Sequence, residues 1–208
     1  MEPWYKIVVP RKELREGRSL DPSEFAVHLE QVVSGQAPKD YVEPDKFFSR
    51  NYFSKALIDH CGMVLRRLNG ETQNTAPVLS LITQFGGGKT HTLTALYHLC
   101  NSGNKAKGFT GVADMMKATE LKEIPKAKVA IFVGNAWDSR PGCETPWIDI
   151  ADQLAGEKGR ELFARSKNAP GTKMLGELLR MVGEPVLVLF DETLIYLGRN
   201  PEQAYQLH

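Results

Sequence analysis

The sequence predicts an α/β fold, a three-layer parallel-sheet core preceded by a helical N-terminal segment. Three short apolar runs, residues 78–82, 128–133 and 186–190, have the length and composition of strands buried on both faces of a parallel sheet. Helical patterns alternate with these runs, which indicates right-handed crossover connections. The helices predicted in this part of the chain span residues 89–99, 112–117, 147–154, 159–165 and 172–182.

Composition agrees with a globular protein. The chain has 208 residues, a net charge of +1, 42% hydrophobic residues and 25% charged residues, which argues against wholesale disorder and against a basic nucleic-acid arm or acidic tail as its main identity. Its apolar runs are of strand length, and its N-terminus lacks the apolar region of a signal peptide, so no membrane partner is expected. The three cysteines form no even framework, which favours the cytoplasm.

The sequence pattern of the first seventy residues predicts mostly helices. Residues 21–24, Asp-Pro-Ser-Glu, form a helix start, and Gly35 ends that helix. A turn-rich aromatic stretch, 38–52, leads into a second helix, 52–68, which Asn69-Gly70 terminates. The predicted division of the chain is a helical segment, residues 1–70, and a core, residues 71–208.

A glycine-rich segment follows the first apolar run. Residues 83–90, Thr-Gln-Phe-Gly-Gly-Gly-Lys-Thr, match the phosphate-loop pattern G-x-x-x-x-G-K-[ST] at Gly88, Lys89 and Thr90, while Thr83 stands where the first glycine is usual. Glycines allow the tight curvature that aims several backbone N–H groups at phosphate oxygens, and the following helix adds its positive end. The alternative interpretation is a glycine turn between a strand and a helix that binds no phosphate, in which Lys89-Thr90 occurs by chance.

Each residue of this loop has an expected task. Lys89 would contact the β- and γ-phosphates as a catalytic residue, and the Thr90 hydroxyl would ligate Mg²⁺. The residues expected to bind the nucleotide cofactor, ATP, are Gln84, Phe85, Gly86, Gly87, Gly88, Lys89, Thr90 and His91.

An acidic pair follows the third apolar run. Asp191 at the end of this strand would hold Mg²⁺ through water, and Glu192 would act as the general base that polarises the attacking water. Taken alone the pair could be a solvated turn. Ligands of open α/β sheets bind at the carboxyl ends of the strands, where both motifs lie, so together they predict a P-loop NTPase core of the AAA+ or ASCE-like type.

The chain resembles a group of bacterial and archaeal AAA+-type P-loop ATPases that is classified as a domain of unknown function. Members are often encoded beside DNA methyltransferases in phage-defence loci. The string Gly-Gly-Gly-Lys-Thr-His-Thr-Leu and the Thr-Pro-Trp element are the more specific parts of the match. The segments that carry the resemblance are residues 4–10, 25–26, 41–52, 85–93, 133–134, 145–147, 169–171 and 189–192, with Tyr196 beyond.

This resemblance implies ATP binding and hydrolysis within a much larger protein that acts in a defence or DNA-modification system. Lys89, Thr90, Asp191 and Glu192 take the family's roles. The implied partners are other domains or subunits of a larger assembly, with DNA contacted only indirectly. Because family members continue well past the acidic strand, the core is expected to be incomplete at its C-terminus, and the chain is expected to bind nucleotide weakly and hydrolyse it poorly.

Other residues admit two readings. The aromatic side chains of Phe47, Phe48, Tyr52 and Phe53 could form a wall against adenine, but packing is the favoured role. His91 could touch phosphate or pack on its helix. The pairs His60/Cys61 and His98/Cys100 fit no standard zinc spacing and favour buried core residues over a metal site. The sequence does not distinguish Arg140, Arg165 and Arg199 as arginine fingers.

Three functions therefore remain open at this stage. The favoured one is Mg²⁺-dependent hydrolysis of ATP. The alternative is a nucleotide-binding regulatory or interaction module without turnover, and the third is a kinase. The adjacent Asp-Glu pair favours hydrolysis over transfer to an acceptor hydroxyl.

Overall fold

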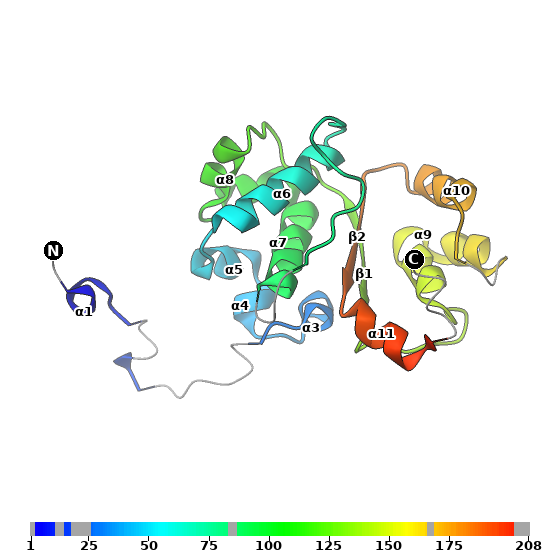
Figure 1. Ribbon diagram of the computed structural model, residues 1–208, viewed down its shortest axis with the longest axis horizontal. Coiled ribbons are helices and arrows are strands. Elements are labelled where there is room, and N and C mark those ends of the chain that lie inside the picture. Colours follow the sequence, from blue (N-terminus) through cyan, green and yellow to red (C-terminus); the bar gives the residue numbers. More distant parts are fainter. Residues whose placement is uncertain (1–2, 11–14, 18–25, 83–86, 166–168, 202–208) are drawn as a thin grey trace.

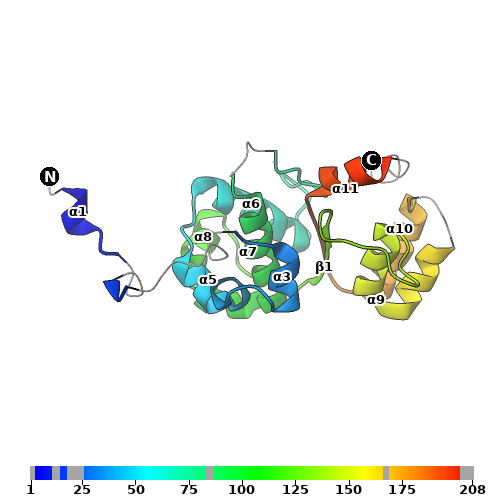
Figure 2. The same ribbon diagram turned by 90° about the horizontal axis from the view of Figure 1, so that it is seen from below.

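The computed structural model describes residues 3–10, 15–17, 26–82, 87–165 and 169–201. At its centre is a parallel sheet of two strands, β1 (Lys128–Val133) and β2 (Val186–Asp191). Helices cover both faces of this sheet, with the helices of residues 29–118 on one side and those of residues 146–199 on the other (Figures 1 and 2). Among the described residues, no helix is long and apolar enough to cross a membrane.

The N-terminal helices begin and end where local signals allow. Ser54 accepts a hydrogen bond from the N–H of Leu57 and caps the longest of them, and Gly35, with a φ of +74°, ends another. The predicted start at residues 21–24 lies outside the described residues. The turn-rich stretch predicted over 38–52 is wrong for most of its length, because two short helices form there. The helices are α1 (Trp4–Ile7), α3 (Leu29–Ser34), α4 (Lys39–Val42), α5 (Pro44–Arg50) and α6 (Lys55–Leu68).

The helices predicted in the rest of the chain are confirmed, with small shifts at their ends. The two predicted over 147–154 and 159–165 are joined into one helix that is kinked at Gly156, where φ is +61°. The last helix, which follows the acidic pair, was not predicted from the sequence. These elements are α7 (Lys89–Ser102), the 3₁₀-helix η2 (Gly103–Gly108), α8 (Val112–Ala118), α9 (Pro146–Ala164), α10 (Thr172–Val182) and α11 (Thr193–Arg199).

The strands predicted over residues 128–133 and 186–190 are confirmed, and the strand predicted over residues 78–82 is wrong. β1 and β2 pair in parallel from Lys128 opposite Val186 to Val133 opposite Asp191. Residues 78–82 adopt no regular secondary structure, and Val78 and Ile82 are 78% and 92% exposed. An apolar run forms a strand only where a neighbouring strand satisfies its backbone groups, and the described residues contain no strand paired with this segment.

The two outer edges of the sheet differ. At the edge of β1, the side chain of Gln153 on α9 accepts from the N–H of Ile131 and donates to its carbonyl, both at 2.9 Å. In a parallel ladder of this register, the backbone groups of Val186, Val188 and Phe190 point away from β1. Among the described residues no strand pairs with that edge of β2.

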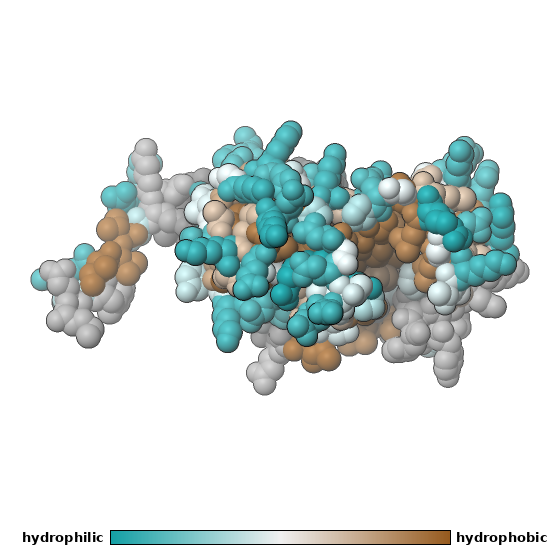
Figure 3. Space-filling model, turned by 90° about the horizontal axis from the view of Figure 1, so that it is seen from above, coloured by the Kyte–Doolittle hydropathy of each residue, from teal (hydrophilic) through white to brown (hydrophobic). Residues whose placement is uncertain are grey.

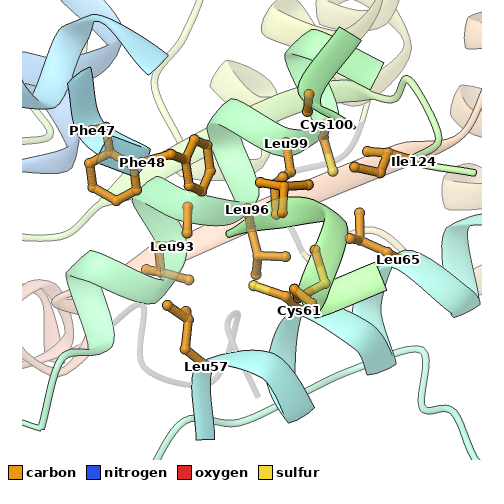
Figure 4. Packing of buried hydrophobic residues seen from close by; sticks show 14 of the residues in the cluster. Phe47, Phe48, Leu57, Cys61, Leu65, Leu93, Leu96, Leu99, Cys100 and Ile124 are labelled. Atoms are coloured by element: carbon orange, nitrogen blue, oxygen red, sulfur yellow. The ribbon is translucent and has the colours of Figure 1, made fainter. Parts of the chain in front are cut away.

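The sheet separates two apolar cores. The first core joins helices α3 to α8 to one face of the sheet, and Figure 4 shows its side chains from α5, α6 and α7 meeting between these helices. Fully buried aromatic and aliphatic groups of this size each stabilise a fold by roughly 1.5–3 kcal/mol. Residues typical of the first core are Phe47, Phe48, Cys61, Leu65, Leu96, Leu99 and Met115.

The second core lies between the opposite face of the sheet and the helices α9, α10 and α11. In the space-filling view of Figure 3, apolar surface is visible in the hollow between the two helical layers. Both cores depend on the sheet, so the carboxyl ends of β1 and β2 are held from two sides. Residues typical of the second core are Ala130, Phe132, Ile148, Leu154, Phe163, Leu178 and Tyr196.

Candidate functional site

The site begins at the N-terminus of α7, directly after the glycines of the predicted phosphate loop. Gly88 has a φ of +73°, a backbone conformation that favours glycine, and it is the residue from which the helix starts. The first N–H groups of any helix lack acceptors within that helix and carry the positive end of its dipole. Thr83, Gln84, Phe85 and Gly86 lie outside the described residues; Gly87, Gly88, Lys89 and Thr90 are described.

The two predicted metal ligands lie in direct contact. The Thr90 hydroxyl donates a hydrogen bond of 2.8 Å to Oδ2 of Asp191, although the two residues are 101 positions apart in sequence. Asp191 is 7% exposed, and its other carboxylate oxygen accepts from the N–H of Glu192 at 3.1 Å. The fold therefore brings the start of α7 and the carboxyl end of β2 to one place.

Glu192, the predicted general base, follows at the start of α11. Its φ of +49° places it in the left-handed region, which is unusual for a residue other than glycine, and its side chain is exposed. Backbone conformations of this kind cost free energy and are often found at functional sites. The chain turns sharply at the end of the strand. As a result, the Asp191 side chain is buried and the Glu192 side chain is exposed.

The end of β1 packs closely on this turn. The N–H of Gly134 donates to the carbonyl of Asp191 at 2.9 Å, and a Cβ at Gly134 would lie 2.3 Å from the carbonyl oxygen of Glu192. Only glycine permits this approach. Gly134, which is part of the sequence resemblance, therefore allows the end of β1 to pack against the turn that carries the acidic pair.

His91 turns toward the N-terminal helices. Its Nε2 lies 2.7 Å from Oδ1 of Asn51, and its ring centroid lies 4.8 Å from that of Phe47. Burial lowers the pKa of His91 below its usual value, so the ring is neutral near pH 7. The contacts of this ring with Asn51 and Phe47 favour a packing role at the edge of the site over a direct contact with phosphate.

A cavity of about 210 Å³ adjoins the start of α7. It lies between α7 and the segment that leads into α6. Of the aromatic residues weighed as an adenine wall, Tyr52 lines this cavity, whereas Phe47 and Phe48 are 2% and 0% exposed within the first core. Its lining residues include Asn51, Tyr52, Ser54, Ala56, Leu57, His60, Leu81, Gly87, Gly88, Lys89, His91 and Thr92.

The described residues contain no group of three or more His, Cys, Asp or Glu side chains that could hold a metal ion, around the histidine and cysteine pairs or elsewhere. His98 instead contacts the carbonyl oxygen of Tyr41 at 2.7 Å. Cys61 and Cys100 are buried in the first core, and burial raises the pKa of each thiol to about 12. Protonated, buried thiols are inert core residues.

Arg140 is engaged in ion pairs on the C-terminal side of the sheet. Its guanidinium donates to Asp149 at 2.7 Å and to Asp152 at 3.0 Å, and these hydrogen bonds raise its pKa. Arg199 donates to the carbonyl oxygen of Asn135 at 3.0 Å. Arg165 is exposed at the end of α9. None of these contacts selects one of the three as an arginine finger.

The Thr-Pro-Trp element also has a structural task. Thr145 accepts a hydrogen bond from the N–H of Ile148 and caps α9, Pro146 occupies its first turn, and Trp147 packs edge-on against Phe190 of β2. The element therefore places α9 on the sheet. Asn51 and Gln153 are positioning residues that the sequence pattern did not reveal, because neither lies in a motif or an apolar period.

Together, a helix N-terminus after glycines, a hydroxyl and a buried carboxylate form an arrangement that can hold a phosphate group and a divalent cation. Comparison with known families matches residues 11–135 to the DUF499 N-terminal domain, a family of unknown function. The chain belongs to this family. No curated protein and no solved structure matches the chain.

Proposed function

We propose that this chain binds ATP with Mg²⁺ and hydrolyses it to ADP and phosphate, as a P-loop ATPase of the AAA+ type. The observation that carries the proposal is the hydrogen bond of 2.8 Å between Thr90 and Asp191 at the N-terminus of α7. A threonine after the loop lysine and a strand-terminal aspartate are the two protein groups that hold Mg²⁺ in P-loop NTPases. Their contact supports a shared metal site.

The proposed reaction is in-line attack of water on the γ-phosphate. Lys89 and the backbone N–H groups at the start of α7 would bind the phosphate oxygens, and Mg²⁺ beside Thr90 and Asp191 would offset the developing charge. Glu192 would orient and polarise the water, because it is the exposed carboxylate next to the metal-binding aspartate.

The wider setting that we propose is a phage-defence or DNA-modification system in the cytoplasm, within a larger assembly. The setting rests on the sequence resemblance, whose more specific parts lie in residues 85–93 and 145–147, and the cytoplasm on the three cysteines. Hydrolysis would then drive movements of other domains or subunits, with DNA contacted indirectly.

The test measures binding of labelled ATP and release of phosphate for three proteins: the wild type, Lys89→Ala and Glu192→Gln. We expect Lys89→Ala to lose binding, and Glu192→Gln to keep binding but lose phosphate release. Binding without release in the wild type would instead favour the regulatory module. No binding of ATP by a folded wild type would refute the proposal.

A further inference from the structure

The first turn of α7, which carries Lys89 and Thr90, follows three glycines in the sequence. Gly88 starts the helix with a φ of +73° and has no side chain that could cap it. Glycines allow this backbone path, but they also have no side chain that could pack and hold the turn in place. The position of the turn therefore depends on the contacts that its own side chains make with other elements.

Different sides of this turn are bound to different parts of the fold. The Thr90 hydroxyl donates to Asp191 at the carboxyl end of β2. His91, the next residue, has its Nε2 2.7 Å from Oδ1 of Asn51, which lies between α5 and α6. Successive residues of a helix are about 100° apart around its axis, so the two contacts approach the turn from different directions. Together they fix the turn between the sheet and the helices α5 and α6.

Asn51 is itself held by the first core. It follows the last residue of α5, and its N–H donates to the carbonyl oxygen of Phe48 at 3.3 Å. Phe48 is fully buried, and its ring is stacked with those of Phe53 and Phe109, whose centroids lie 5.8 and 5.4 Å away. Closely packed aromatic rings resist displacement, so Asn51 offers His91 a partner at a fixed position.

The amide of Asn51 is also costly to the fold. Its Nδ2 is buried and has no hydrogen-bond acceptor in the part of the chain that the structure describes. A buried donor without an acceptor is destabilising, and such donors are rare in native proteins. The contact between Oδ1 and His91 gives this polar side chain a task, because it holds the imidazole ring in one orientation.

His98 offers a comparison on the same helix. The rings of His91 and His98 both pack on Phe47, with centroids 4.8 and 5.2 Å from it. Nε2 of His98 lies 2.7 Å from the carbonyl oxygen of Tyr41, so each histidine joins α7 to the preceding helices by a ring contact and a polar contact. His98 differs in its place, because it lies about two helical turns beyond the start of α7.

We infer that Asn51 and His91 are positioning residues for the phosphate site. Their contact fixes the first turn of α7, and with it the directions in which Lys89 and Thr90 face phosphate and Mg²⁺. The inference rests on the proposed binding of ATP with Mg²⁺ and adds how that site is held in place. Removing a group that orients the ligands of a metal site typically lowers affinity about 10- to 100-fold.

The experiment measures ATP affinity by calorimetry with Mg²⁺ present, and the melting temperature without nucleotide. His91→Phe keeps a ring against Phe47 but loses the polar contact with Asn51, and we expect ATP affinity to fall about tenfold. His91→Gln supplies an N–H donor at a similar distance from the backbone. It is expected to restore most of the affinity, because the hydrogen bond and not the ring positions the turn.

His98→Phe is the matched control, with the same substitution on the same helix. His98 is 3% exposed, so loss of its contact with Tyr41 is expected to lower the melting temperature at least as much as His91→Phe does. Its ATP affinity is expected to equal that of the wild type, since the start of α7 keeps its contacts.

Asn51→Ala tests the other partner of the contact. We expect ATP affinity to fall as far as in His91→Phe. The double variant with Asn51→Ala and His91→Phe is expected to bind ATP no more weakly than either single variant, because both substitutions remove the same contact.

The outcomes separate the positioning role from the proposed function. Wild-type ATP affinity in His91→Phe or Asn51→Ala, or an equal loss in His98→Phe, would overturn the positioning role while ATP binding stands. An affinity of His91→Gln as low as that of His91→Phe, or additive losses in the double variant, would also overturn it. Absence of ATP binding by the folded wild type would refute the proposed function and the positioning role with it.

Discussion

Asp191 and Asp149 are equally buried, with exposures of 7% and 8%, but their partners differ. Asp149 accepts hydrogen bonds from the Arg140 guanidinium at 2.7 Å and from the Gln153 amide at 2.9 Å. Within the part of the chain that the structure describes, the hydrogen bonds to the Asp191 carboxylate come from the Thr90 hydroxyl and the backbone N–H of Glu192. A buried carboxylate is stable only when its charge is compensated.

This difference assigns the two carboxylates to different tasks. Arg140 neutralises Asp149 and Asp152, and this cluster ties the loop after β1 to α9. The Thr90–Asp191 pair lies at a helix N-terminus where a hydroxyl and a carboxylate can share a hard cation. Carboxylates of similar burial thus serve structure on one side of the sheet and, in our proposal, Mg²⁺ on the other.

The largest effect is expected from exchanging charge at matched positions. Asp191→Asn keeps the shape of the side chain but removes the charge that would hold Mg²⁺ through water. We expect Mg²⁺-dependent affinity for ATP to fall about 10- to 100-fold, the usual cost of removing such a group. Asp149→Asn is the matched control, and calorimetry should give it wild-type affinity. Equal losses in both variants would abolish the distinction between the two sites.

The second effect concerns stability. Asp149→Ala removes the acceptor of Arg140 and Gln153, and we expect the free energy of unfolding to fall by about 2 kcal/mol. For a chain of this size, that corresponds to a melting temperature lower by about 4–8 °C. Thermal unfolding followed by circular dichroism measures the change. A variant as stable as the wild type would show that the Arg140 cluster is a solvated surface group.

A smaller effect is expected at the edge of β1. Gln153→Ala leaves the N–H and carbonyl of Ile131 without the partners that the side chain supplies at 2.9 Å. We expect a loss of about 1 kcal/mol in the free energy of unfolding, because water replaces part of these bonds. Urea unfolding checks this value, with Gln153→Glu as a second variant that keeps the acceptor but sets a carboxylate against Asp149 and the Ile131 carbonyl oxygen, and is therefore expected to be less stable than Gln153→Ala.

The smallest effect is a pH dependence on the α7 side. Burial lowers the pKa of both His91 and His98 from the ordinary value of 6.5, so the unfolded chain binds these protons more readily than the folded chain. Stability from this source is therefore complete above pH 6.5 and decreases as the pH falls below it. Melting temperatures measured from pH 8 to pH 5 should show the decrease. His98→Gln, which can still donate to the Tyr41 carbonyl, should show a weaker decrease.

Much of the site followed from the sequence because its chemistry depends on short local patterns. A glycine-rich turn before Lys89-Thr90 and an apolar run before Asp191-Glu192 are each readable within ten residues. The contact between Thr90 and Asp191 itself is a consequence of topology. Both motifs were expected at strand ends from the sequence, but residues 78–82 form no strand, and it is the start of α7 that meets the carboxyl end of β2.

The parts that the sequence did not predict depend on distant partners. Residues 78–82 have the apolar composition of a strand, but strand formation requires a paired neighbour, which composition does not report. Asn51 and Gln153 are single polar residues whose roles arise from His91 and Ile131, far away in sequence. Phe47 and Phe48 were ambiguous between a ligand wall and a core, and only the packing of α5 on α7 decides for the core.

The central claim is that Thr90 and Asp191 hold the Mg²⁺ of bound ATP. A crystal structure of the chain with Mg²⁺ and a non-hydrolysable ATP analogue tests it most directly. We predict the phosphates against the backbone N–H groups of Gly87 to Thr90, and Mg²⁺ about 2.0–2.1 Å from the Thr90 hydroxyl oxygen. A nucleotide bound elsewhere, or a metal ion away from Thr90 and Asp191, would contradict the claim.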